Sequence, residues 1–125
     1  MLTTTSAFSG FSVDDQSAAL AFYKDKLGLD VRDTGMGLEL HVGAIHVFIY
    51  PKDDHAPATF TVLNFEVADI DAAVDELVAA GVTLERYEGS HQDDKGIARG
   101  KSANMGPDIA WFKDPAGNIL SVLNG

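Results

Sequence analysis

The chain has 125 residues and a net charge of −10, from 9 basic and 19 acidic residues. Its length suits one domain, and 46% hydrophobic and 22% charged residues are ordinary values for a globular protein. The acidic balance argues against nucleic acid as a partner, and the lack of cysteine excludes disulfides and thiolate chemistry. No apolar run approaches the ~18 residues of a membrane span. The first ten residues lack a signal-peptide pattern, so we expect a cytoplasmic protein.

The first half of the chain predicts a strand, a helix and three further strands. Phe11 and Val13 alternate with small or polar residues, which is the period of a strand. Asp14 or Asp15 can cap the helix by accepting hydrogen bonds from its free amides, and Gly28 ends it. The strands expected in this half are residues 7–13, 29–33, 38–42 and 45–50, and the last two form a hairpin.

The second half repeats this order after a linker, rich in proline and charge, at about residues 52–58. Asp69 caps a helix that Gly81 ends. The loop from Glu88 to Pro107 has few apolar side chains, and a loop of this length is usually functional or disordered. The apolar stripe of the helix comprises Ile70, Ala73, Val74, Leu77 and Val78. The strands expected here are residues 59–67, 82–87, 108–113 and 119–123.

The two halves are an internal duplication. Asp15 aligns with Asp69 at an offset of 54 positions, and the copies then slip by one residue so that Gly28 aligns with Gly81. A duplication of this kind indicates two similar modules, each with the order βαβββ. We therefore expect one α+β domain over residues 1–125, with module one at about 6–51 and module two at about 59–125.

Two segments and the duplication together resemble a known family. The segments are AFYKDKLGLDV after the first strand and DPAGNILSV near the end. They are similar to the vicinal-oxygen-chelate superfamily, which includes glyoxalase I, extradiol dioxygenases, methylmalonyl-CoA epimerase and bleomycin-resistance proteins. The resemblance covers nearly the whole chain. It implies a cup-shaped, eight-stranded mixed sheet with helices on the convex side, a ligand groove on the concave side, and a homodimer.

The resemblance also locates a metal site that this sequence does not retain. Enzymes of the family usually hold one divalent metal with histidines and carboxylates from four strands. Phenylalanine and valine have no lone pair for a metal, so we expect no metal site and no cofactor. His46 is the one side chain in residues 45–50 that could bind a metal. The four corresponding positions are Phe8, Val62, Ser121, and either Phe48 or Tyr50.

The groove is instead expected to hold a ligand by shape and a few polar groups. Asn64 and Glu66 share the parity of Val62, so both would face the groove. Glu66 is a candidate general base or partner for a ligand cation, or it lies in water at the strand end. Aromatic side chains would stack on a flat ligand, or pack in the core or at a dimer interface. The candidate ligand-binding residues are Phe8, Phe48, Tyr50, Val62, Asn64, Glu66, Trp111 and Ser121, and Phe60 and Phe112 have an ambiguous parity.

Other polar residues have two interpretations each. Glu39 and His41 share one face of a strand, either as a metal or acid–base pair or as a polar edge in solvent. His55 and His91 lie in loops and are expected to be exposed, although His91 could approach a ligand if its loop covers the groove. The basic residues of the long loop either form a lid over an anionic ligand or are solvated, and they are Lys95, Arg99 and Lys101.

The first function that these residues support is metal-independent binding of a small apolar or aromatic molecule, as in the bleomycin-resistance branch. The second is a metal-dependent lyase or isomerase of the glyoxalase or epimerase type, with non-standard ligands such as His46, His41 or Glu66. A third is an accessory dimer without a ligand. Whether the chain is an enzyme stays open, and neither nucleic acid nor a membrane is expected as a partner.

Overall fold

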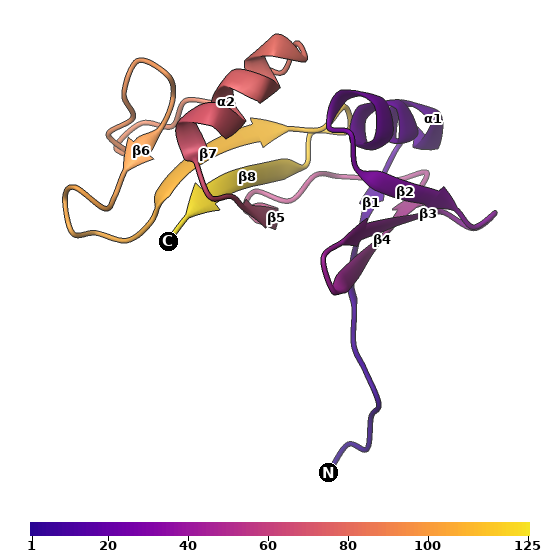
Figure 1. Cartoon of the computed structure of the whole chain (residues 1–125). Helices are drawn as coiled ribbons and strands as arrows, with labels where there is room; N and C mark the ends of the chain where they lie inside the picture. The colour runs from indigo at the N-terminus through magenta and orange to yellow at the C-terminus, as the bar shows by residue number, and fades with distance from the viewer. The chain divides into compact units, whose positions relative to one another are not determined.

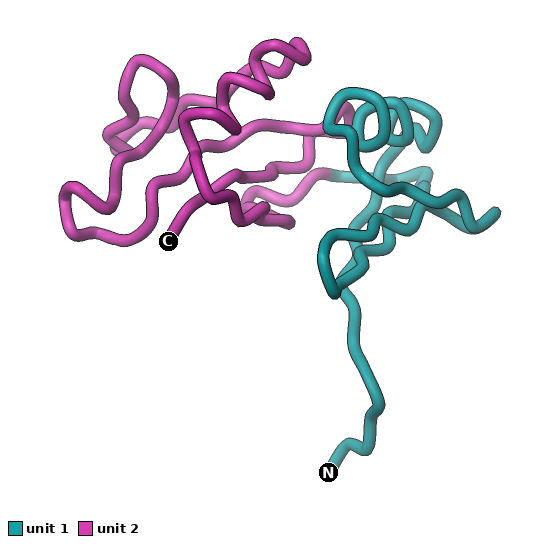
Figure 2. The backbone as a smooth tube through the Cα atoms, in the orientation of Figure 1, with its two compact units in different colours: residues 1–56 teal, residues 57–125 magenta.

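The structure, a computed structural model, describes all of residues 1–125. They form two compact units, residues 1–56 and residues 57–125 (Figure 2). Each unit holds one four-stranded sheet and one helical segment, which gives eight strands in two modules and confirms the α+β class. No helix has the length and apolar character needed to span a bilayer.

The first unit contains β1 (Ser9–Val13), α1 (Gln16–Leu20), η1 (Ala21–Lys26), β2 (Asp30–Asp33), β3 (Leu38–Val42) and β4 (Ile45–Pro51). Its strands are hydrogen-bonded in the order β1-β4-β3-β2 (Figure 1). β1 and β4 are parallel, whereas the other two pairs are antiparallel. The helical segment between β1 and β2 packs on one face of this sheet through the aromatic side chains of Phe11, Phe22 and Tyr23.

The second unit contains β5 (Thr61–Glu66), α2 (Ile70–Ala79), β6 (Ala98–Arg99), β7 (Asp108–Lys113) and β8 (Ile119–Asn124). The strand order is β5-β8-β7-β6, with β5 and β8 parallel and the other pairs antiparallel. β5, β8 and β7 thus take the places of β1, β4 and β3 in the first unit. α2 packs on the sheet through contacts with β7 and β8 (Figure 1).

The two helical segments begin and end alike. Asp15 and Asp69 have nearly the same extended backbone, with φ of −130° and −133°, and each Oδ1 accepts a hydrogen bond at 3.1 Å from the amide three residues on. Gly28 and Gly81 follow the helix ends with positive φ angles of 69° and 86°, a conformation that favours glycine. The predicted caps and stops are confirmed.

The one-residue slip between the copies has a structural cause in η1, which is a π-helix rather than the α-helix expected from the sequence. The amide of Leu27 donates to the carbonyl of Phe22, five residues earlier, at 3.0 Å. A π turn closes over one more residue than an α turn. The first module therefore accommodates an extra residue between its aspartate cap and its glycine without losing the helix.

The core of each unit lies between the sheet and its helix. Because side chains alternate along a strand, one face of each sheet supplies the core and the opposite face, called here the non-helix face, does not. The buried hydrophobic residues of the first unit are Phe11, Val13, Ala19, Phe22, Tyr23, Val31, Leu38, Leu40, Val47 and Ile49. Those of the second unit are Ile70, Val74, Leu77, Val82, Ile97, Ala110, Phe112, Leu120 and Val122.

Residues 82–87, expected as a strand, form only an isolated bridge at Leu84. The side-chain amide of Gln92 forms hydrogen bonds with backbone groups that a neighbouring strand would otherwise pair. Its amide nitrogen donates to the carbonyl of Glu85 and its amide oxygen accepts from the backbone amide of Tyr87, both at 2.8 Å. The edge strand β6 comes instead from the long loop, which the sequence analysis left without a strand.

Val78 was expected in the apolar stripe of the second helix, but it is 58% exposed, whereas Val74, one turn earlier, is 1% exposed. Replacing Val74 by Ala removes two buried methyl groups and leaves a cavity. We expect Val74→Ala to lower the free energy of unfolding by about 2 kcal/mol in urea denaturation. The matched variant Val78→Ala should change it by less than about 0.5 kcal/mol. Equal losses in the two variants would contradict the burial described here.

Candidate functional site

The non-helix face of the first unit carries most of its aromatic and histidine side chains outside the core. Phe48 and Tyr50 alternate along β4 with Val47 and Ile49, which are buried on the helix side. The predicted parity of these residues is therefore correct. Other side chains on the same face, placed by strand register, are Ser12, Asp30, Arg32, Glu39, His41 and His46.

Five rings on this face lie in near-parallel pairs. Phe8 stacks on His46 with ring centroids 4.8 Å apart, and His46 stacks on His41 at 5.9 Å. Phe48 stacks on Tyr50 at 5.8 Å with an interplanar angle of 18°. These five residues are called the aromatic platform below. Near-parallel rings present flat π faces, which suit contact with planar, conjugated molecules.

Gly37 leaves space for the ring of Phe48, and Gly10 leaves space for the backbone carbonyl of Phe48. A Cβ atom at Gly37 would be 2.8 Å from Cζ of Phe48 and 2.7 Å from the carbonyl oxygen of Ile49. A Cβ atom at Gly10 would be 2.9 Å from the carbonyl oxygen of Phe48. All three distances are shorter than van der Waals contact, so any side chain at Gly37 would displace the ring. The sequence analysis did not single out either glycine.

Glu39 and His41 form a close pair on this face. Glu39 Oε1 lies 2.6 Å from His41 Nε2, an ion-pair distance at an angle unsuited to a hydrogen bond, and their side chains are 34% and 27% exposed. His55, expected to be exposed, is half-buried instead, with Nδ1 2.7 Å from Ser12 Oγ. Glu39 and His41 are thus partly shielded from solvent, and whether they act as a metal or acid–base pair or as a polar edge stays a prediction.

The sequence analysis left open whether Phe48 or Tyr50 is the fourth position that the family resemblance implies. The pairing of the strands decides between them. Gly10 on β1 pairs with Phe48 on β4, and Asn64 on β5 pairs with Ser121 on β8. Gly10 and Asn64 are separated by the offset of the duplication, so Phe48 is the counterpart of Ser121.

The second unit carries a row of three predicted residues, Asn64, Ser121 and Trp111, on adjacent strands. Ser121 is fully buried and donates a hydrogen bond from Oγ to Asn64 Oδ1 at 2.5 Å. Tyr87, which the sequence analysis missed, meets Trp111 edge to face at 5.4 Å. Burial and then the charge of Glu85 raise the pKa of Tyr87. The structure thus brings these predicted polar and aromatic residues together.

The remaining predicted residues have different environments. Val62 lies at an irregularity in the pairing of β5, between Thr61 and Leu63. Glu66 is exposed at the end of β5, as its strand-end interpretation expected. The ambiguous aromatics also separate, because Phe60 is 68% exposed and Phe112 is buried in the core at 1%.

The donor groups needed for a metal are not gathered. No group of three or more histidines, aspartates or glutamates that could hold a metal ion occurs anywhere in the chain, which lacks cysteine. His41 and His46 are neighbours in the first unit, whereas Glu66 belongs to the second unit. At the four positions that the family resemblance implies for metal ligands, the only side-chain donor is the hydroxyl of Ser121. The residues present therefore do not fit the metal of the family.

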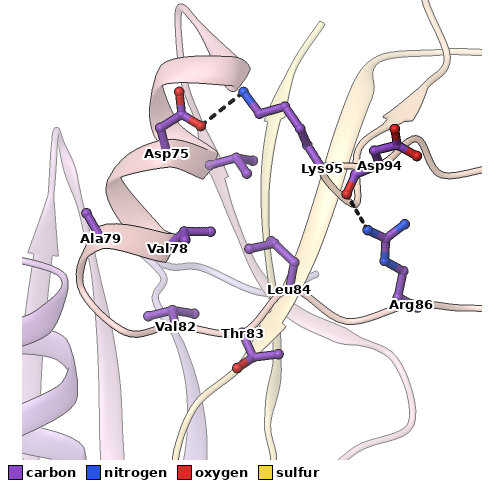
Figure 3. Close-up of a pocket in the computed structure, with 10 residues that line it drawn as sticks. Asp75, Val78, Ala79, Val82, Thr83, Leu84, Arg86, Asp94 and Lys95 are labelled. Atoms are coloured by element: carbon purple, nitrogen blue, oxygen red, sulfur yellow. Dashed lines mark hydrogen bonds and ion pairs between the residues drawn. The ribbon is translucent and has the colours of Figure 1, made fainter.

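An open cleft of about 590 Å³ lies between α2 and residues 82–95 (Figure 3). None of the predicted ligand-binding residues lines it. The two basic side chains that line the cleft already have partners within the protein. Lys95 pairs with Asp75, and Arg86 donates to the backbone carbonyls of residues 93 and 94. Its apolar lining consists of Val74, Val78, Ala79, Val82 and Leu84.

The long loop is held to α2 by a group of ion pairs, called here the ionic clasp, formed by Asp71, Asp93, Lys95 and Arg99. Arg99 donates two hydrogen bonds to Asp71, at 2.8 and 3.0 Å, and one to Asp93 at 2.9 Å. Lys95 Nζ lies 3.1 Å from Asp71 Oδ1. Neither the lid nor the solvated-loop interpretation anticipated these pairs. Of the three basic residues predicted in the long loop, Lys95 and Arg99 are paired with carboxylates of the second unit. Lys101 is exposed and has no ion pair.

The clasp has a defined pH dependence. Hydrogen bonds from Arg99 and Lys95 hold the pKa of Asp71 well below its usual range. Burial alone would raise the pKa of Asp93, but hydrogen bonds from the Ile97 amide and Arg99 lower it. A carboxylate with a depressed folded pKa stabilises the fold above its unfolded pKa of about 4, and this stabilisation is lost as pH falls through the folded value.

We therefore expect Asp71→Asn to lower the melting temperature at pH 7, with a difference from the parent chain that shrinks as pH falls below about 4. It should also shrink in 1 M salt, where the Debye length is about 3 Å. Differential scanning calorimetry at several pH values measures both effects. Asp94→Asn, in the same loop but without an ion pair, is the control. A difference that persists unchanged at pH 3 and in high salt would refute the clasp.

Comparison with known families gives one match. The sequence profile of the Glyoxalase/Bleomycin resistance protein/Dioxygenase superfamily matches residues 7–122, nearly the whole chain. None of the curated proteins compared with the chain matches it.

Solved structures share the fold at low sequence identity. A protein from Bacillus anthracis assigned to the glyoxalase family superposes with a TM-score of 0.69 at 17% identity, covering 100% of this chain and 99% of that chain. A glyoxalase family protein from Enterococcus faecalis gives 0.67 at 20% identity, with 98% and 99% covered. A lactoylglutathione lyase from Agrobacterium tumefaciens gives 0.65 at 21% identity, with 98% and 96% covered. At these identities the likeness extends to the fold alone.

Proposed function

Because the chain belongs to the Glyoxalase/Bleomycin resistance protein/Dioxygenase superfamily, we propose that it binds a small apolar or aromatic molecule without a metal. The observation that carries this proposal is the aromatic platform on the non-helix face of the first unit. The family resemblance implies that Phe8 and Phe48 lie at two of the positions where enzymes of the family place metal ligands. Phenylalanine at these positions offers a flat apolar face and no lone pair for a metal.

The platform has the properties of a contact surface for a planar ligand. Its rings lie in near-parallel pairs with centroid separations of 4.8 to 5.9 Å. Phe8 is 62% exposed, and Phe48 and Tyr50 are half-buried, so each retains surface that a ligand can cover. Covering apolar surface contributes roughly 25 cal/mol per Å², and stacked rings add about 0.5–1.5 kcal/mol per pair.

Polar groups are available for orientation. On the platform these are the Glu39–His41 pair and the hydroxyl of Tyr50. In the second unit, Asn64 is held by Ser121 and is itself exposed, so its side-chain amide nitrogen can donate to a ligand. We assign Asn64 and Trp111 a separate contact role, with buried Ser121 orienting Asn64, to be tested by their own variants.

A thermal-shift screen of planar aromatic compounds, run in excess chelator, tests the proposal. A ligand that binds only the native state at one hundred times its dissociation constant adds about 2.7 kcal/mol to the stability. We expect at least one compound to raise the melting temperature with the chelator present. In parallel, elemental analysis of protein purified without chelator is expected to find no stoichiometric metal. Near-equimolar zinc, nickel, manganese or iron would instead favour a metal-dependent lyase or isomerase.

The homodimer implied by the family resemblance is part of this proposal. Sedimentation equilibrium should give twice the 13.3 kDa mass of the chain. If the chain is a monomer at micromolar concentration, the proposed homodimer is wrong. The thermal-shift screen would still test the binding function.

A further inference from the structure

A serine and a histidine of the first unit form a nucleophile–base pair that the proposed function does not use. Ser12 Oγ lies 2.7 Å from His55 Nδ1, and both residues are half-buried. When Nδ1 carries no proton, the hydroxyl is the donor of this hydrogen bond. A serine hydroxyl becomes an effective nucleophile when an imidazole within hydrogen-bond reach accepts its proton. The pair therefore meets the first geometric requirement of acyl transfer.

Two backbone hydrogen bonds tie the turn that carries His55 to β1. The amide of Lys52, directly after β4, donates to the carbonyl of Val13 at 2.9 Å, and the amide of His55 donates to the carbonyl of Lys52 at 3.1 Å. Ser12 itself lies within β1, where it pairs with Tyr50 on β4. Because backbone contacts of the first unit set both partners, the pair is positioned before any substrate binds.

The serine faces the aromatic platform. Its strand neighbours Phe11 and Val13 are buried on the helix side at 8% and 0% exposure, so Ser12 points to the non-helix face. Tyr50, its cross-strand neighbour on that face, stacks on Phe48 at 5.8 Å. A substrate whose aromatic ring lies on Tyr50 would place a group attached to that ring beside Ser12 Oγ. An ester of a phenol fits this arrangement, and its phenoxide is a weakly basic leaving group.

We propose that Ser12, activated by His55, cleaves aryl esters of short carboxylic acids. The inference rests on the proposed binding function for the place of the aromatic ring and adds an acyl transfer to it. Ser12 Oγ attacks the ester carbonyl carbon as its proton passes to His55 Nδ1. The bond from that carbon to the aryl oxygen breaks, the phenoxide takes the proton from His55, and an acyl ester of Ser12 remains. Water then attacks this ester, passing one proton to His55, and the carboxylic acid leaves as that proton returns to Ser12 Oγ.

Acetylation of the full chain by 4-nitrophenyl acetate tests this step. The reaction is run with chelator present, and absorbance follows the release of 4-nitrophenol. The quenched protein is then digested and analysed by tandem mass spectrometry. We expect a rapid burst of about one equivalent of 4-nitrophenol, which is the kinetic signature of an acyl-enzyme. We also expect an acetyl group on Ser12 in the digested protein.

Variants separate acyl transfer from folding. Ser12→Ala should abolish both the burst and the acetylated peptide. His55→Gln keeps a polar partner for the hydroxyl but removes the base, so it should slow acetylation roughly 100-fold with an unchanged circular dichroism spectrum. Ser9→Ala is the matched control, because Ser9 is exposed on the same strand, and it should leave both readouts unchanged.

Either of two results overturns the proposal. One is the absence of an acetyl group on Ser12 with the ester in excess, and the other is acetylation of Ser12 that is equally fast in His55→Gln. Binding of 4-nitrophenol, measured by thermal shift, distinguishes this failure from failure of the proposed function. A thermal shift without acetylation of Ser12 removes the acyl transfer and leaves the binding function in place. Absence of both removes the acyl transfer and counts against nitrophenyl compounds as ligands of the platform.

Discussion

Asp114→Ala is expected to lower the free energy of unfolding by about 3 kcal/mol or more. Asp114 is 5% exposed, and its Oδ1 accepts hydrogen bonds from the backbone amides of Ala116 and Asn118 at 3.0 and 2.9 Å. Its Oδ2 accepts from the side-chain amide of Asn118 at 2.9 Å. Removing the carboxylate leaves these donors without this acceptor in a closed turn, and each buried unpaired donor costs about 1–3 kcal/mol.

Chemical denaturation monitored by circular dichroism measures this loss. Asp53→Ala is the control, because Asp53 is an exposed turn residue and its replacement should cost less than about 0.5 kcal/mol. A loss below 1 kcal/mol for Asp114→Ala would show that the turn does not depend on the carboxylate. The DPAGN segment, which carries much of the family resemblance, forms the turn of the final hairpin.

The double variant Phe48→Ala, Tyr50→Ala is expected to weaken binding of a planar ligand from the thermal-shift screen roughly a hundredfold. Two stacked rings would be lost, and a hundredfold corresponds to about 2.7 kcal/mol. Both side chains lie outside the core, so the fold should survive. Isothermal titration calorimetry gives the affinity, and denaturation confirms the fold.

Ile45→Ala is the matched control for this variant. Ile45 lies on the same strand, is 59% exposed, and alternates with the platform residues. Its replacement should leave the affinity unchanged. Unaltered affinity in the double variant, or an equal loss in Ile45→Ala, would place the ligand elsewhere.

Local and periodic features of the fold could be predicted from the sequence. The helix caps at Asp15 and Asp69 depend on one side chain and an amide three residues away, so they leave a local signature. The two-residue period of β4 predicted which side chains avoid the core, and this placed Phe48 and Tyr50 on one face. The duplication predicted two βαβββ modules because both copies have the same pattern of elements.

Features that depend on partners distant in sequence could not be predicted. Asp71 and Arg99 are 28 residues apart, and no period links a half-buried helical aspartate to a loop arginine. Residues 82–87 have strand-like composition, but the amide of Gln92 satisfies backbone groups that a neighbouring strand would have paired. The π-helical segment was visible only as a one-residue slip between the copies, which sequence alone does not assign to a type of helix.

An NMR titration tests metal-independent binding on the platform most directly. The ¹⁵N-labelled chain is titrated, in excess chelator, with a planar compound from the screen. We predict saturable shifts concentrated at the amides of β1, β3 and β4, with the largest near His46 and Phe48. Binding that appears only after a divalent metal is added, or shifts concentrated at the cleft beside Val78, would contradict it.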